Sequence, residues 1–185
     1  LSRDNCMFKV IGISGSLRNS SLNSLFLRAM ALIAPKDISF EISALPGNLP
    51  LFNPDLEDAA PEIVSQWRHE LQQADLFLIV SPEYAHGVSG VIKNALDWLV
   101  SSGELLDKPV AMPNLSPRTD LAQGHLREIV TVMGGMLSDS CSPAATLDCR
   151  YVLPDITEQQ LIDHPRISPR LQQLWQDISD TLHSS

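Results

Sequence analysis

Short runs of aliphatic and β-branched residues alternate with segments of helical spacing along much of the chain. Such runs predict strands at residues 8–13, 38–42, 76–80 and 109–112. Elsewhere, apolar side chains recur every three or four positions, which predicts helices over residues 22–33, 63–71, 88–99 and 126–137. The run LFLIV at residues 76–80 is apolar throughout, as a strand covered on both faces requires. This alternation predicts an α/β fold with one parallel sheet and helices on both of its faces.

Proline marks several boundaries between these elements. Residues 45–61 contain four prolines and predict a loop, and Pro61 suits the first turn of the helix that follows. Ser168, followed by a proline, predicts the start of a last helix with apolar residues at helical spacing behind it. The pattern between residues 138 and 166 is poor, and a fifth strand is placed within residues 145–152.

Composition indicates one globular domain spanning residues 1–185. Hydrophobic residues make up 44% of the chain and charged residues 19%, which excludes a disordered or fibrous protein. The formal net charge of −9 argues against nucleic acids and anionic membranes as partners, because phosphate-rich surfaces need a basic face. No apolar run approaches the roughly 20 residues of a membrane span. A small anionic ligand is not excluded, since a few backbone amides and one arginine can hold a phosphate.

The three cysteines, Cys6, Cys141 and Cys149, form neither a disulfide framework nor a spaced set of metal ligands. The histidines show no metal-ligand spacing either, so no metal site is expected. An odd number of cysteines without a CxxC pair is typical of reduced thiols inside the cell. The first residues of the chain are too polar for a signal peptide. These observations predict a cytoplasmic protein.

The loops that follow the strands are the candidate ligand sites, because ligands of parallel α/β sheets bind beyond the carboxyl ends of the strands. The first such loop, residues 15–23, reads GSLRNSSLN and leads directly into a helix. Its hydroxyl groups and backbone amides can converge on an anion at the helix N-terminus, and Arg18 can add positive charge. It matches neither a Walker loop nor a dinucleotide-binding GxGxxG. The alternative is a helix cap at Ser20, Ser21 or Asn23 without any ligand.

The second loop, residues 81–90, follows the most apolar strand and combines prolines, glycines and a tyrosine into a platform suited to a flat ring. His86 is its acid–base candidate, because imidazole changes charge near neutral pH, although a loop histidine is more often a bystander. Glu83 is expected to bond backbone amides or to pair across an interface rather than to transfer protons. The third loop, residues 113–123, offers further polar groups to the same rim: Ser116, Arg118, Thr119 and Asp120.

Three motifs of the chain together resemble the conserved stretches of one known family. GSLR at residues 15–18, with Ser21 and Asn23, resembles the family's GSLRxxSxN. PEY at residues 82–84 and KNALDW at residues 93–98 resemble its PEYNxSxPxxLKNAIDW. Between these motifs stands LPLFNPD, at residues 49–55, which resembles a further family stretch. The order and spacing of the motifs fit, and the resemblance runs from about Val10 to Leu137. The family that the chain resembles is that of the NADPH-dependent FMN reductases.

The resemblance implies a flavodoxin-like three-layer α/β/α sandwich with a five-stranded parallel sheet that binds FMN noncovalently. It also implies an oxidoreductase that takes a hydride from NADPH or NADH and passes electrons to a small-molecule acceptor in a ping-pong cycle. Family acceptors are quinones, azo dyes, metal ions and free flavin. The chemistry belongs to the flavin, so no side chain is expected to be catalytic, and His86 would at most orient the acceptor or the nicotinamide. A homodimer or homotetramer is implied as well.

The family's binding residues can be carried over position by position. Those expected to hold the FMN phosphate are Ser16, Arg18, Ser21, Leu22 and Asn23. Those expected to line the flavin ring are Pro82, Glu83, Tyr84, Ala85 and Ser116.

The chain departs from the family pattern around the expected ring site. Ala85 replaces the asparagine usual after PEY, and Ser89 replaces a proline. After the fourth strand the family's Gly-Gly-x-Arg is missing; residues 116–118 read SPR, and Leu121 stands where the arginine is expected. These changes keep a second hypothesis open, in which the chain is a flavodoxin-like binding or regulatory module with weakened or lost flavin binding.

Overall fold

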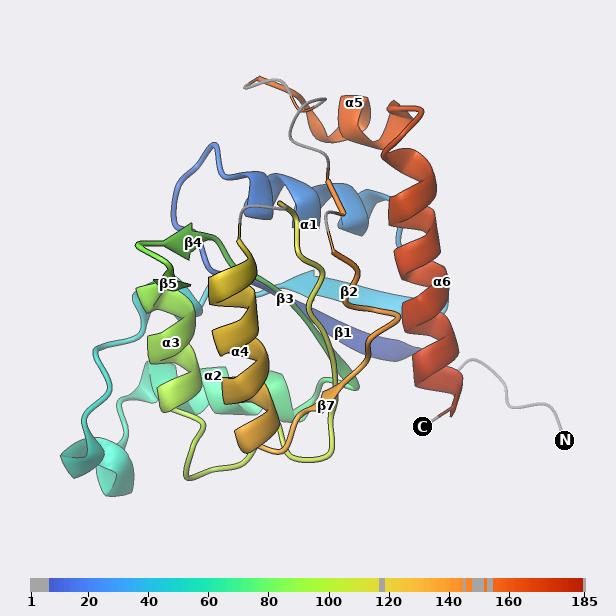
Figure 1. Cartoon of the computed structure of the whole chain (residues 1–185). Helices are drawn as coiled ribbons and strands as arrows, with labels where there is room; N and C mark the ends of the chain where they lie inside the picture. Colours follow the sequence, from blue (N-terminus) through green and yellow to red (C-terminus); the bar gives the residue numbers. More distant parts are fainter. Residues whose placement is uncertain (1–6, 117–118, 145, 148–151, 153–154, 185) are drawn as a thin grey trace, which may run out of the picture.

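A parallel sheet of five strands forms the centre of the computed structural model, which describes residues 7–116, 119–144, 146–147, 152 and 155–184 (Figure 1). Its strand order is β2-β1-β3-β6-β7, and every neighbouring pair is parallel. The expectation of a five-stranded parallel sheet is therefore confirmed. The strands are β1 (Phe8–Ser14), β2 (Ile38–Ile42), β3 (Leu76–Val80), β6 (Pro109–Ala111) and β7 (Met136–Leu137).

Helices cover both faces of this sheet and complete a three-layer sandwich (Figure 1). One face packs against α1 (Leu22–Leu32) and α6 (Ser168–Ser184), with α5 (Glu158–Asp163) beside α1. The other face packs against α2 (Glu62–Gln72), α3 (Gly90–Asp97) and α4 (Asp120–Val132). Two short strands, β4 (Glu83–Tyr84) and β5 (Gly87–Val88), form a separate antiparallel hairpin after β3.

The central strands divide their side chains between two hydrophobic cores. In β3 every residue is buried; Leu78 contributes to the core under α1 and α6, whereas Phe77 contributes to the core under α2, α3 and α4. Fully burying an aliphatic or aromatic side chain of this size is worth roughly 1.5–3 kcal/mol. The three tryptophans, Trp67, Trp98 and Trp175, are buried in these cores.

The fifth strand is not where the sequence pattern placed it. The fifth strand is β7, which follows α4 and pairs with β6. The helical spacing of the sequence predicts that the helix continues through this stretch to Leu137. Gly134, with φ of 81°, ends α4 in the left-handed conformation that glycine adopts without strain. Two residues are too few for a strand to show alternation. Of the expected strand at 145–152, the described residues 146, 147 and 152 are not in a strand, and the others lie outside the described residues.

Two further boundaries differ from the sequence pattern. The proline-rich segment 45–61 is not only loop, because Pro46 and Pro54 begin short 3-10 helices, η1 (Pro46–Asn48) and η2 (Pro54–Ala59). Proline favours the first turn of a helix, where its missing N–H costs nothing. Val88 belongs to β5 rather than to the helix that follows. No helix in the part of the chain that the structure describes combines the length and apolarity needed to cross a membrane.

Candidate functional site

The ends of β1 and β3 mark the topological switch of the sheet. From β1 the chain crosses to β2 on one side, while β3 pairs with β1 on the other side. Open α/β sheets bind ligands at such a point, beyond the carboxyl ends of the strands. The backbone amide of Gly15 donates to the carbonyl of Val80 over 2.8 Å, so the first and second loops start side by side.

Gly15 also allows the two loops to pack closely. A Cβ atom at this position would lie 2.7 Å from Ser89 Oγ and 2.9 Å from Ser81 Oγ, closer than non-bonded atoms tolerate. The hydroxyl of Ser89 caps α3 by accepting a hydrogen bond from the amide of Ile92 over 3.4 Å. Ser89, which replaces a family proline, therefore keeps a role at the helix start and borders the first loop.

The first loop ends in a capped helix N-terminus. Ser21 is the N-cap of α1, and its Oγ accepts from the amide of Asn23 over 3.2 Å, as the capping alternative predicts. Ser16, Ser21 and Asn23 are all buried, with relative exposures of 8%, 5% and 7%. A helix N-terminus carries amides without partners inside the helix and a partial positive charge. Hydroxyl and amide groups thus converge where an anion is best stabilised.

The remaining residues of the first loop lie around this helix end. Arg18 is exposed, its Nε donates to Ser20 Oγ over 3.0 Å, and its backbone amide approaches Ser16 Oγ at 3.4 Å. The guanidinium therefore stays next to the helix N-terminus and adds charge there. Leu22 packs its side chain partly against the core, so its expected contribution to a ligand is its backbone amide.

The second loop is a hairpin with a strained turn. Tyr84 pairs with Gly87, and the two central residues have positive φ, 49° for Ala85 and 60° for His86. This is the arrangement of a type I′ turn, which asparagine and glycine favour. Other residues lose about 1–2 kcal/mol each in the left-handed region. Tyr84 at its edge is 56% exposed and free to face a ligand.

Glu83 connects this hairpin to α4. Its Oε2 accepts from the backbone amide of Ala122 over 3.0 Å, and its Oε1 lies 3.0 Å from His86 Nδ1. The expectation that Glu83 bonds backbone amides is confirmed. The Ala122 amide lowers the pKa of Glu83 below its ordinary value, and the hydrogen bond and charge of His86 act in the same direction.

Asn114 organises the third loop, and sequence reasoning did not identify it. Its side chain is 6% exposed, and Oδ1 accepts from the amide of Ser116 over 3.2 Å and from the hydroxyl of Thr119. Its backbone bonds the carbonyl of Pro143 over 2.9 Å and the amide of Thr146 over 2.8 Å. The available signal was the Asn-x-Ser triplet, since asparagine commonly bonds the amide two residues ahead.

The polar residues that the third loop was expected to offer to the rim differ in how exposed they are to solvent. Ser116 and Thr119 are half-buried, and Asp120 is exposed at the first turn of α4. Leu121, at the position of a family arginine, is 53% exposed. Arg118 lies outside the described residues.

The segment LPLF, at residues 49–52 (the LPLF segment), is held by α3. Asn94 accepts from the amide of Phe52 over 2.8 Å and donates to the carbonyl of Pro50 over 3.0 Å. Trp98 Nε1 donates to the same carbonyl over 2.8 Å, and its ring meets Phe52 edge-on with centroids 5.1 Å apart. Two motifs far apart in sequence are therefore one structural unit.

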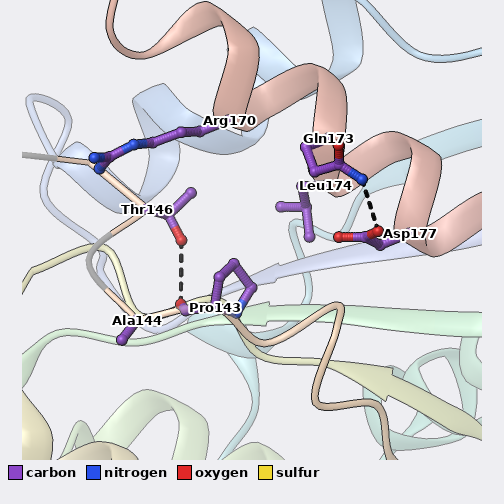
Figure 2. Close-up of a pocket in the computed structure, with 7 residues that line it drawn as sticks. All are labelled: Pro143, Ala144, Thr146, Arg170, Gln173, Leu174 and Asp177. Atoms are coloured by element: carbon purple, nitrogen blue, oxygen red, sulfur yellow. Dashed lines mark hydrogen bonds between the residues drawn. The ribbon is translucent and has the colours of Figure 1, made fainter.

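A cavity of about 270 Å³ lies between α6 and the segment that follows β7 (Figure 2). Thr146 and Pro143 border it on one side, and Leu174 and Asp177 of α6 on the other. None of the residues that line this cavity belongs to the first or second loop. The cavity is therefore separate from the candidate site, where the first and second loops meet at the topological switch of the sheet.

A family model for NADPH-dependent FMN reductases matches residues 8–146, which include all of the loops described above. The chain belongs to this family. Among related FMN reductases and quinone reductases, 2-hydroxy-1,4-benzoquinone reductase from Burkholderia sp is 38% identical over 127 residues, 65% of this chain and 69% of that protein. A quinone reductase from Escherichia coli is 36% identical over 171 residues, 84% of this chain and 88% of that protein.

The FMN reductase fold extends over nearly the whole chain. The solved structure of FerB, a flavoenzyme NAD(P)H:(acceptor) oxidoreductase from Paracoccus denitrificans, superposes with a TM-score of 0.80. The match covers 96% of this chain and 98% of that one, at 25% sequence identity. It extends the similarity beyond residue 146, through the helices of the C-terminal part. The flavodoxin-like fold expected from the motifs is thus confirmed.

Proposed function

We propose that this chain is an FMN-dependent NAD(P)H oxidoreductase that reduces a quinone. The observation that carries the proposal is the buried group of Ser16, Ser21 and Asn23 at the N-terminus of α1, at the topological switch of the sheet. A dianionic phosphate fits this site, because amides, hydroxyls and the helix dipole all stabilise negative charge there. Two of the related proteins are named for the reduction of quinones.

The phosphate would be held by the first loop. Ser16 and Ser21 accept amide hydrogens in the folded chain, which leaves their own hydroxyl hydrogens free to point at a phosphate oxygen. Arg18 would supply a charged hydrogen bond from the rim. Leu22 would supply its backbone amide and Asn23 its buried side-chain amide, because the Asn23 backbone amide already bonds Ser21.

The flavin ring would lie against the hairpin and the third loop. Pro82 would line it from just before β4, Tyr84 and Ala85 from β4 and the turn, and Ser116 from the third loop. Glu83 would contribute from beneath the hairpin. When bound, FMN supplies the transfer of electrons from NADPH or NADH to the acceptor in a ping-pong cycle, which no side chain here can replace. The protein's part is to orient the ring and to leave one face open to both substrates.

The proposal is tested by the visible absorbance spectrum of the purified protein. After reconstitution with FMN and desalting, we expect flavin bands that stay with the protein, bleach with NADPH or NADH under nitrogen and return on addition of a benzoquinone. A protein that retains no flavin after reconstitution would overturn the proposal. It would favour the alternative, a binding or regulatory module in which the changes at Ala85 and in the third loop have removed the flavin.

We further propose that the chain forms a homodimer or homotetramer through the rim of this site. Leu51 is 84% exposed and Tyr84 56% exposed beside the loops that would hold the flavin. Exposed apolar side chains that form a contiguous patch are typical of protein interfaces, and Leu51 and Tyr84 are the candidates for such a patch. Sedimentation velocity should give a dimer or tetramer mass for the wild type and a smaller species for Leu51→Lys. A wild-type monomer at micromolar concentration would contradict the proposal.

A cytoplasmic location also belongs to the proposal. Cys141 is a fully buried free thiol, with Sγ 3.3 Å from the hydroxyl of Thr181. A free thiol is compatible with a reducing compartment. Cell fractionation followed by detection of the protein in the membrane-free soluble fraction is the direct test, and recovery from a secreted fraction would contradict it.

A further inference from the structure

The β4–β5 hairpin is a strained element with few interactions of its own. Each strand has two residues, pairing Glu83 with Val88 and Tyr84 with Gly87. An isolated two-stranded hairpin is marginal even with an ideal turn, and here both turn residues are non-glycine residues at positive φ. Ala85 and His86 are exposed, so the turn itself buries no apolar surface, and in the hairpin only Val88 of β5 packs partly against the core. A contact from outside the hairpin must therefore fix its conformation.

The carboxylate of Glu83 makes that contact. One oxygen lies 3.0 Å from His86 Nδ1 within the turn, and the other accepts the amide of Ala122 in the first turn of α4 over 3.0 Å. The Glu83 side chain is 10% exposed, whereas that of His86 is 79% exposed. The carboxylate therefore lies between the turn and α4, under the surface that the turn presents. A negative charge at this helix N-terminus is also favourable.

We propose that Glu83 is a positioning residue, whose carboxylate fastens the strained turn to α4 and thereby sets where the hairpin lies at the flavin ring. The proposal rests on the proposed function, because it assigns a consequence for bound FMN. Glu83 acts through Tyr84 and Ala85, the residues expected to line the ring. Without the carboxylate, the turn keeps its strain but loses the two bonds that oppose it.

The test compares Glu83→Ala with the double variant Glu83→Ala/Ala85→Gly. Amide hydrogen exchange at residues 84–88 should become about tenfold faster in Glu83→Ala, because two hydrogen bonds are lost. Glycine adopts positive φ without strain, so the double variant should recover the slow exchange of the wild type. Glu128→Ala is the matched control, since it removes an exposed carboxylate from α4 itself.

Bound FMN supplies the second readout. In Glu83→Ala we expect a shifted flavin absorption band and a dissociation constant raised about tenfold, both reversed by Ala85→Gly. A wild-type flavin spectrum in Glu83→Ala would overturn the positioning role, even with faster exchange. Faster exchange and a shifted spectrum that Ala85→Gly fails to restore would overturn it as well. A wild-type chain that binds no FMN would instead overturn the proposed function, and exchange alone would then decide whether Glu83 holds the turn.

Discussion

Capping a helix and binding a phosphate are compatible roles for the serines of the first loop. Ser21 Oγ accepts from the amide of Asn23, and a hydroxyl that accepts one hydrogen bond still has its own hydrogen to donate. The two hypotheses for this loop, helix cap and anion site, are therefore not exclusive. The cap even favours the anion site, because it fixes the serine at the positive end of the helix.

Replacement of Arg18 by alanine should weaken FMN binding about tenfold. The guanidinium lies at the rim, exposed to water, so its charged hydrogen bond to phosphate is taken at the lower end of the usual range, about 1.5 kcal/mol. Flavin fluorescence titration gives the dissociation constant. Arg28→Ala is the control, because Arg28 lies within α1, the helix that follows the first loop, and pairs with Glu158. Equal effects of the two substitutions, or none from Arg18→Ala, would contradict the assignment.

Single residues were predictable where their partners are local in sequence. Ser21 directly precedes a run of helical spacing, so its capping role could be predicted. Glu83 is a polar residue in a loop whose neighbouring backbone amides need hydrogen-bond partners, so its bond to a backbone amide could be predicted as well. Asn94 was not identified, because its partners lie 42 and 44 positions away. The strain at Ala85 and His86 also had no signal, since only a folded hairpin forces these residues to positive φ.

Among the larger elements, the LPLF segment owes its shape to α3. The carbonyl of Pro50 accepts from both Asn94 and Trp98, and Phe52 is held through its amide and its ring. A proline-rich segment has few amides for bonds of its own, so side chains of a neighbouring helix provide them. The KNALDW motif therefore maintains a loop at the site although its own residues belong to a helix.

Asn94→Ala should lower the free energy of unfolding by about 1–3 kcal/mol, because two hydrogen bonds are lost and the amide of Phe52 is left unpaired. Urea denaturation measures the loss, and limited proteolysis should show faster cleavage within residues 49–60. Asn48→Ala is the control, since Asn48 makes one exposed bond to the carbonyl of Ala44. Similar losses in the two variants would argue against the anchoring role of Asn94.

Whole elements were predictable where the apolar pattern is long enough to have a period. The strand at residues 76–80 and the helices around it followed from burial on both faces and from helical spacing. The fifth strand did not, because β7 has two residues and follows a helix whose spacing runs into it. Its position is determined by pairing with β6, which no local pattern records.

For the molecule as a whole, two carboxylates change the pH dependence of stability in opposite directions. Partial burial between α2 and the sheet edge raises the pKa of Glu70 above its ordinary value near 4.5, while the bond from Ser43 and the charge of Lys9 oppose the rise. The hydrogen bond from Arg28 lowers the pKa of Glu158. Glu70 thus costs stability as the pH rises above 4.5, and Glu158 loses its contribution as the pH falls below it.

Glu70→Gln should make the protein more stable than the wild type at pH 7. The gain should vanish below pH 4.5, where Glu70 is protonated in both the folded and the unfolded chain. Urea unfolding from pH 4 to pH 8 measures the difference. Glu62→Gln on the same helix should change stability little and in the opposite direction, because Glu62 stands in the first turn of α2. A gain that is constant over this pH range would contradict a titration of Glu70.

The anchoring of the LPLF segment has a consequence for how such a protein can diversify. Pro50 and Phe52 are fixed to α3, and between them Leu51 makes so little contact with the fold that 84% of it faces solvent. Within a single folded chain, residue 51 can therefore mutate with almost no loss of stability, even where it contributes to an interface between subunits. We expect descendants of this sequence to adapt to new acceptors or new partner subunits first at this position, while the residues on either side stay constant.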